Sequence, residues 1–222
     1  WDFGDGNTST DRNATHTYAA PGLYSVTLNA SNAYGYNLTT FENYIDVGNP
    51  PAAGFTTNVT GGNAPQAVQF TDTTEHTPTS WNWTFGDGSF SEDQHPVHVY
   101  TAAGTYTVTL NASNAFGFSL NSTTISVLDP PVANFSANAT VIPTGSAVAF
   151  TDDSTGDITG WAWDFGDGNT STDRNATHTY TAPGTYSVTL NASNPYGYNI
   201  STRTDYIDVG NPPAAGFSAN AT

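Results

Sequence analysis

The chain has 222 residues and a formal net charge of −16, because 19 acidic residues are balanced by only 3 Arg and no Lys. Nucleic-acid binding and attraction to anionic lipid both need clustered cations, so this composition excludes them. The absence of Cys excludes disulfide frameworks, thiolate catalysts and cysteine-ligated zinc.

The sequence also lacks signals for membrane insertion. It opens on Trp1 with no apolar leader, so any signal peptide is expected outside this stretch. No segment approaches the roughly 18 apolar residues that a membrane helix needs. We therefore expect no membrane insertion within these residues.

Three copies of one pattern follow one another along the chain. Trp-Asp-Phe-Gly-Asp-Gly at 1–6 recurs at 163–168, and as Trp-Thr-Phe-Gly-Asp-Gly at 83–88. Residues 1–60 and 163–222 are identical at 49 of 60 positions, whereas the middle copy matches either of them far less well. The order is therefore A-B-A, with two types of repeated unit.

The units begin at similar sequence motifs, and these motifs define the unit boundaries. We expect a unit at 1–48 that lacks its N-terminal strands, complete units at 52–128 (B-type) and 132–209 (A-type), and the first strand of a following unit at 213–222. The chain is then a window on a longer tandem array. Paired prolines between the units favour polyproline II, which predicts short and stiff linkers.

Every unit is predicted to be an antiparallel β-sandwich. Apolar residues alternate with Ser, Thr and Asn from Tyr186 to Ser193, as on a strand with one buried face. About seven short strands in about 80 residues are typical of a small sandwich. Without disulfides, its stability depends on aromatic burial. The expected core of the third unit is Trp161, Trp163, Phe165, Phe150, Tyr180 and Tyr186.

Three motifs of the third unit carry a family resemblance. Trp-Asp-Phe-Gly-Asp-Gly at 163–168, His-Thr-Tyr at 178–180 and Pro-Gly-Thr-Tyr-Ser-Val-Thr-Leu at 183–190 resemble the polycystic kidney disease (PKD) domain. The resemblance covers the whole chain through its three copies. It implies seven-stranded, immunoglobulin-like sandwiches that act outside the cell as spacers or interaction modules and carry no catalytic residues. The B-type unit departs from the motif at Thr84, where the motif has Asp.

The Gly-Asp-Gly triplet and the histidines have structural interpretations. Gly166 and Gly168 suit positive φ, and Asp167 can accept hydrogen bonds from nearby amides and close a hairpin. His178, two residues before a Tyr like its counterparts in the other units, is expected to be a hydrogen-bonded structural histidine. His95 and His98 do not predict zinc, because positions three apart on a strand point to opposite faces.

Asp152, Asp153 and Asp157 are candidate calcium ligands. Some PKD domains hold Ca²⁺ in this region, and oxygen-rich loops suit that hard cation. The alternative interpretation is a set of solvated loop acids, and the sequence leaves both open. Apart from calcium and covalent glycans, we expect no cofactor.

Two further functional interpretations are disfavoured. The pair Trp161 and Trp163 would suit a sugar-stacking platform, but alternation turns both inward, so a core role is expected. A hydrolytic triad can be written from Ser, His and Asp, yet each candidate occupies a repeated structural position and no Gly-x-Ser-x-Gly elbow occurs. We therefore expect no enzyme.

The strongest signal is the density of N-glycosylation acceptor motifs (sequons), Asn-x-Ser/Thr with x not Pro. They include 15 of the 22 Asn residues, where random placement predicts about 5.5. Alternation places several of them on outward faces, Asn191 and its counterparts among them. The acceptors are Asn7, Asn13, Asn29, Asn37, Asn58, Asn82, Asn111, Asn121, Asn134, Asn138, Asn169, Asn175, Asn191, Asn199 and Asn220.

These observations predict a structural glycoprotein at the cell surface, an array of tandem units in a surface layer or extracellular fibre. Near-identical units suit regular self-association, because identical surfaces present identical contacts. The sequons, the acidity and the lack of Cys point to an archaeal host. Two alternatives remain open: an adhesion module that binds carbohydrate or protein, and a spacer of a secreted hydrolase.

Overall fold

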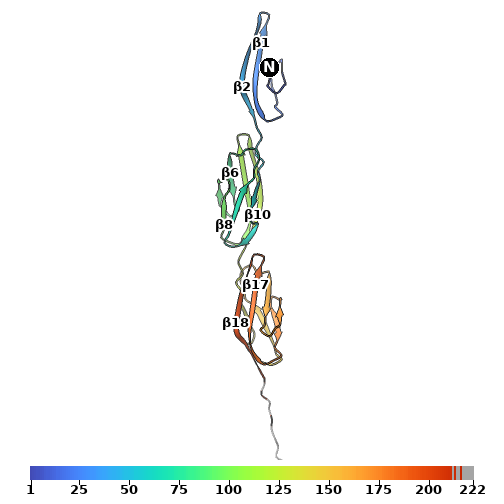
Figure 1. Ribbon diagram of the computed structural model, residues 1–222, viewed down its shortest axis with the longest axis vertical. Coiled ribbons are helices and arrows are strands. Elements are labelled where there is room, and N and C mark those ends of the chain that lie inside the picture. The colour runs from blue at the N-terminus through green and yellow to red at the C-terminus, as the bar shows by residue number, and fades with distance from the viewer. Residues whose placement is uncertain (212, 214–215, 217–222) are drawn as a thin grey trace, which may run out of the picture. The chain divides into compact units, whose positions relative to one another are not determined.

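The computed structural model describes residues 1–211, 213 and 216, which form strands and no helix (Figure 1). The all-β fold class is therefore confirmed. Nothing in the described residues makes a helix long and apolar enough to cross a membrane. The strand expected at 213–222 lies outside the described residues, apart from Pro213 and Gly216.

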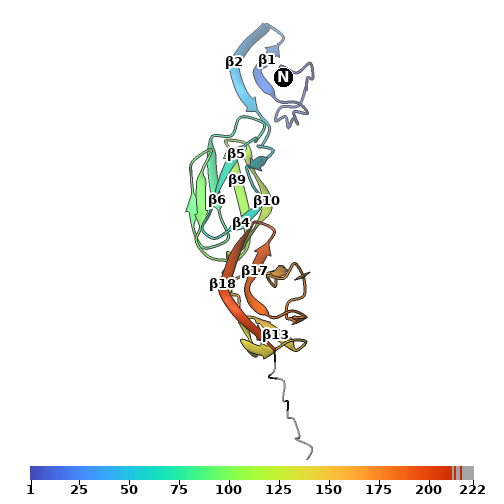
Figure 2. The ribbon, with the colours of Figure 1, turned by 60° about the horizontal axis from the view of Figure 1, so that its bottom comes forward.

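The third unit is a sandwich of two sheets. Its strands are β11 (Phe135–Ala137), β12 (Val141–Pro143), β13 (Ala147–Asp152), β14 (Gly160–Asp164), β15 (Thr170–Ser171), β16 (Ala176–Thr179), β17 (Gly184–Asn194) and β18 (Gly197–Gly210). One sheet has the order β11-β13-β16 and the other the order β12-β18-β17-β14-β15. Figure 2 labels β13 of the first sheet and β17 and β18 of the second.

This unit has eight strands where seven were predicted, because its first strand is divided between the sheets. β11 pairs antiparallel with β13, and β12 pairs parallel with β18. Asn138 lies where the chain changes sheets. Its backbone N–H donates to the carbonyl of Ala149 at 3.0 Å, and its Oδ1 accepts the Ala149 N–H at 2.8 Å. Alternation along a sequence does not reveal such a change of partner.

The core lies between the two sheets. Trp163, Phe165, Phe150 and Tyr180 are buried, as predicted. Trp161 and Tyr186 are only partly buried and pack against this core. Aliphatic residues and one further aromatic residue complete it: Phe135, Ile142, Val148, Ala176, Val188, Leu190, Ile207 and Val209.

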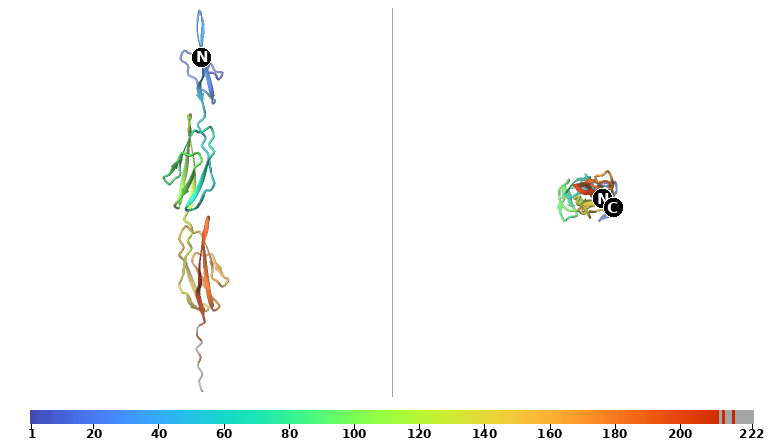
Figure 3. Two further views of the ribbon diagram at one scale, coloured as in Figure 1. Left: turned by 60° about the vertical axis from the view of Figure 1, so that its left-hand side comes forward. Right: turned by 90° about the horizontal axis from the view of Figure 1, so that it is seen from below.

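The second unit repeats this arrangement. Its strands are β3 (Phe55–Thr57), β4 (Gly61–Asn63), β5 (Gln66–Asp72), β6 (Ser80–Thr84), β7 (Phe90–Ser91), β8 (Val97–Tyr100), β9 (Gly104–Asn114) and β10 (Gly117–Leu128). They form sheets of order β3-β5-β8 and β4-β10-β9-β6-β7, which match those of the third unit strand for strand. The left view of Figure 3 draws the second unit mainly in teal and green and the third from yellow to red.

The first unit contains β1 (Gly22–Asn32) and β2 (Gly35–Val47), which pair as a two-stranded sheet. Residues 1–48 correspond to 163–210 of the third unit. This stretch has no counterpart of β13, whose residues Val148 and Phe150 share the core cluster of Val188. Val26 is accordingly half-buried, whereas its counterpart Val188 is fully buried.

Candidate functional site

The Gly-Asp-Gly turn joins β14 to β15, and its aspartate forms a hydrogen bond with a histidine. Gly166 and Gly168 have φ of 82° and 91°, which glycine adopts without strain. Asp167 accepts the Asn169 N–H at 3.1 Å through Oδ1, and its Oδ2 lies 2.7 Å from Nε2 of His178. The predicted turn and the predicted structural histidine are both confirmed.

The same carboxylate–histidine pair recurs in the other two units, with Asp5 and His16 at 2.7 Å and Asp87 and His98 at 2.7 Å. The hydrogen bond from His16 lowers the pKa of Asp5 to about 2. Burial opposes the shift at Asp87, but hydrogen bonds from Ser89 and His98 outweigh it and lower its pKa to about 2.

Acid should therefore destabilise the units between about pH 4 and pH 2. An aspartate titrates near 3.9 in an unfolded chain, so the stabilisation from a depressed pKa is complete above about pH 4 and is lost as the pH falls through the folded value. Urea unfolding followed by Trp fluorescence across this range measures the loss. In the variant Asp5→Asn/Asp87→Asn/Asp167→Asn the loss should be less steep, and an equally steep loss would contradict this assignment.

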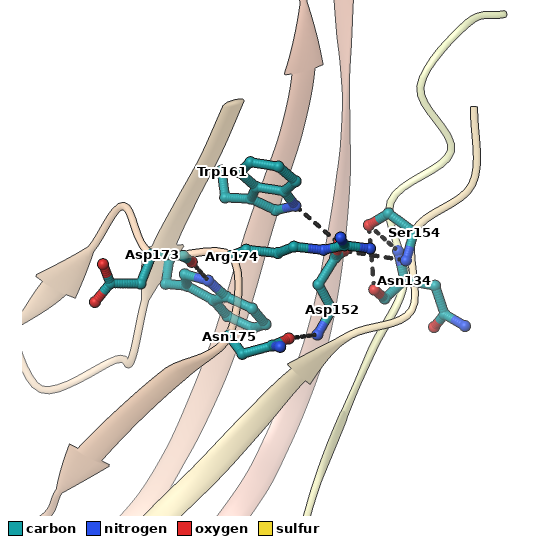
Figure 4. A network of polar contacts seen from close by, with 8 residues as sticks. Asn134, Asp152, Ser154, Trp161, Asp173, Arg174 and Asn175 are labelled. Carbon is teal, nitrogen blue, oxygen red and sulfur yellow. Dashed lines mark hydrogen bonds and ion pairs between the residues drawn. The ribbon is translucent and has the colours of Figure 1, made fainter. Parts of the chain in front are cut away.

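Asp152 is the centre of a polar network at the edge of the core (Figure 4). Its Oδ2 accepts the indole N–H of Trp161 at 2.9 Å and Nε–H of Arg174 at 3.3 Å. Its Oδ1 accepts the Ser154 N–H at 3.1 Å. Burial opposes ionisation, but these hydrogen bonds outweigh it and lower the pKa of Asp152.

The three candidate calcium ligands have separate surroundings. The side chain of Asp152 is 1% exposed and bound within its network, while Asp153 is exposed. Asp157 accepts the backbone N–H of Asp129, in the linker, at 2.7 Å. The part of the chain that the structure describes contains no group of three or more His, Cys, Asp or Glu able to hold a metal. Asp152 therefore takes part in the fold, and Asp157 binds the backbone of the linker.

The Trp-x-Trp pair belongs mainly to the core. Trp163 is fully buried, and its indole N–H donates to the carbonyl of Asp173 at 2.8 Å. Trp161 faces the same way but lies half-buried at the margin of the core. Cζ of Arg174 lies over its ring, 5.7 Å from the centroid. Neither ring is an open platform for sugar stacking.

The sequon asparagines lie largely on the surface. Of the fourteen that the structure describes, eleven are exposed: Asn7, Asn13, Asn29, Asn37, Asn58, Asn82, Asn134, Asn138, Asn169, Asn175 and Asn199. Asn220 falls outside the described residues. A bulky covalent group on any of the exposed eleven would extend into solvent.

Four exposed sequons take part in the fold through the oxygen of the side-chain amide. In each, Oδ1 accepts a backbone N–H at 2.8–3.0 Å: Asn58, Asn138, Asn175 and Asn199. An N-glycosidic bond replaces a hydrogen on Nδ2 and leaves Oδ1 able to accept. These side chains can therefore support the backbone and carry a glycan at the same time.

Three sequon side chains are only half-exposed. Asn121 donates from Nδ2 to the carbonyl of Ala53 at 3.0 Å, so modification would disturb that contact. Asn111 and Asn191 lie on the outward face, as predicted, since Ala112 and Ala192 beside them point into the core. Neighbouring strands crowd both amides, and each Oδ1 is buried without a hydrogen-bond partner.

The chain belongs to the PKD domain family. The family's sequence pattern matches residues 1–47, 48–128 and 128–209. Human polycystin-1 is 29% identical over 196 residues, a match that covers 85% of this chain. The chain spans only 4% of the length of that relative.

Solved structures show the same fold at low sequence identity. The titin fragment I67–I69, with immunoglobulin domains, superposes with a TM-score of 0.59 at 16% identity, covering 84% of this chain and 74% of the fragment. The PKD1 domain of the Vibrio cholerae metalloprotease PrtV is 32% identical and matches 35% of this chain and 95% of that domain, with a TM-score of 0.32. The titin superposition establishes the immunoglobulin-like fold.

Proposed function

We propose that this chain is a structural segment of an extracellular filament or surface layer, built from PKD units that carry many N-linked glycans. The observation that supports the proposal most is the position of the sequons. Eleven of the fourteen described acceptors are exposed, and four of these use only Oδ1 in their backbone hydrogen bonds.

Glycans would also account for the unusual composition. Only 10% of the residues are charged, and cations are almost absent. Such a surface has few charged side chains to hydrate it, and attached sugars would hydrate it instead. The proposed role is non-catalytic, and the only added groups that it requires are the covalent glycans.

The repeated surface of the A-type units supports self-association. The A-type copies are nearly identical over 60 residues, so successive units would offer a neighbour the same contacts. An adhesion module or the spacer of a secreted hydrolase would use the same units without forming an assembly. Whether the native protein is assembled or monomeric distinguishes these roles.

Electron microscopy of extracellular material from the native host tests the proposal. The expected result is a filament or layer with a regular repeat, from which mass spectrometry identifies peptides of this chain. Isolated monomers would overturn the structural role. Peptides found only with a hydrolase domain on the same chain would favour the spacer instead.

A further inference from the structure

Each unit exposes a pair of large apolar side chains on its last long strand. An aromatic and an aliphatic residue lie two positions apart, so both point to one face of the strand. All six side chains are between 53% and 72% exposed. Single exposed apolar residues are ordinary, but a pair repeated in every unit marks a surface that something covers. The pairs, here called the apolar stripe, are Tyr36 with Leu38, Phe118 with Leu120, and Tyr198 with Ile200.

A sequon asparagine is paired with this stripe across the sheet. In the third unit Asn191 of β17 is the register partner of Ile200, and Ser193 is the partner of Tyr198. In the first unit Asn29 is likewise the partner of Leu38. Direct partners in an antiparallel pair have Cβ atoms about 4.5–5.5 Å apart on the same face. The acceptor and the apolar side chains are therefore immediate neighbours.

The amide of Asn191 is oriented for a glycan beside the stripe. Its Oδ1 is buried without a hydrogen-bond partner, and the same holds for its counterpart Asn111. Asn191 as a whole is half-exposed. An amide with Oδ1 turned inward and Nδ2, the atom that a glycan uses, turned outward fits both observations. A sugar attached there would also bring hydroxyl donors next to the unpartnered oxygen.

The surroundings suit a neutral carbohydrate. The next register pair on this face is Thr189 with Thr202, and the partner of Asn191 on its other side is Ala162. These three side chains are uncharged, and the hydroxyls can hydrogen-bond to sugar. Asp164, the partner of Thr189 on β14, adds a carboxylate that can accept from sugar hydroxyls. A pyranose ring has a face of C–H groups that packs on aromatic and aliphatic side chains. Covalent attachment holds the ring at high effective concentration, so a weak contact suffices.

We propose that the apolar stripe of each unit is covered by the carbohydrate linked to its paired asparagine: Asn29, Asn111 or Asn191. The proposal depends on the N-glycosylation proposed above and adds a specific contact for three of the glycans. The stripe would then be a platform for the chain's own sugar and not a surface for a second copy.

Hydroxyl-radical footprinting of the full chain, produced in a glycosylating host, tests this contact. Tyr198 should be protected at low protein concentration, and its labelling should rise severalfold in Asn191→Gln. Ser193→Ala removes the same sequon but keeps the asparagine, so it should give the same rise. Asn13→Gln, which removes an exposed sequon in another unit, is the matched control and should leave Tyr198 protected.

Three results would overturn the contact. One is a Tyr198 that is labelled freely in the glycosylated chain. Another is protection that persists in Asn191→Gln and grows with protein concentration, which would assign the stripe to a second copy. The third is a bare Asn191 in a chain whose other sequons carry glycans. If glycopeptide analysis finds every sequon bare, the proposed glycosylation itself fails, and this outcome is distinct from the other three.

Discussion

Replacing Trp163 with alanine should remove most of the stability of the third unit while the second unit stays folded. Trp163 is fully buried, and its ring centroid lies 5.3 Å from that of Phe135 and 5.8 Å from that of Phe150. Removing a buried Trp costs about 3–5 kcal/mol, because the cavity closes only in part. The change also leaves the carbonyl of Asp173 without its indole donor.

Hydrogen exchange followed by mass spectrometry of the full chain measures this loss unit by unit. Amides of β13 and β17 should exchange far faster in Trp163→Ala, while those of β5 and β9 in the second unit serve as the internal control. Unchanged protection in β17 would show that Trp163 is not central to the core.

Replacing Asp152 with alanine should destabilise the third unit by about 2–4 kcal/mol, because three partners lose a buried acceptor at once. The indole N–H of Trp161, the backbone N–H of Ser154 and the guanidinium of Arg174 all bind its carboxylate. Arg174 is mostly exposed and returns to water at little cost, so the main loss is at the first two.

The matched control is Asp153→Ala, one residue along the chain and exposed. It should change the free energy of unfolding by less than about 0.5 kcal/mol. Asp152→Asn, which keeps a side-chain oxygen but loses the charge, should fall between the two. Equal effects of Asp152→Ala and Asp153→Ala in urea unfolding would contradict the network.

The turn and the histidine were predictable because their determinants are local and repeated. Asp167 binds an amide only two residues away, and the two glycines that shape the turn flank it in the sequence. The partner of His178 lies eleven residues away, yet both recur in every copy. Repetition within the chain therefore marked both residues as structural without showing that they bind each other.

The role of Asp152 could not be predicted in the same way. It stands beside Asp153 in the sequence, which favours a loop acid or a calcium ligand. Its partners Trp161 and Arg174 lie 9 and 22 residues away and meet it only in the folded unit. One signal was present: Asp72 and Trp81 recur with the same spacing in the second unit and form the same hydrogen bond at 2.8 Å.

The outward face of Asn191 was predictable from alternation, but its partial burial was not. β17 lies inside its sheet, between β14 and β18, so the side chains of both neighbours crowd the amide. The apolar stripe has the same origin, because strand pairing alone places Ile200 opposite Asn191. That register follows from the two-residue turn between Asn194 and Gly197, which alternation alone does not locate.

Glycopeptide mass spectrometry of the native protein tests the central claim most directly. With only 3 Arg and no Lys, the chain needs a protease other than trypsin to yield one sequon per peptide. Glycans are predicted on most of the eleven exposed asparagines. Asn121, which is only half-exposed and whose Nδ2 binds the carbonyl of Ala53, should be the least occupied. Bare asparagine at most of the exposed positions would contradict the account.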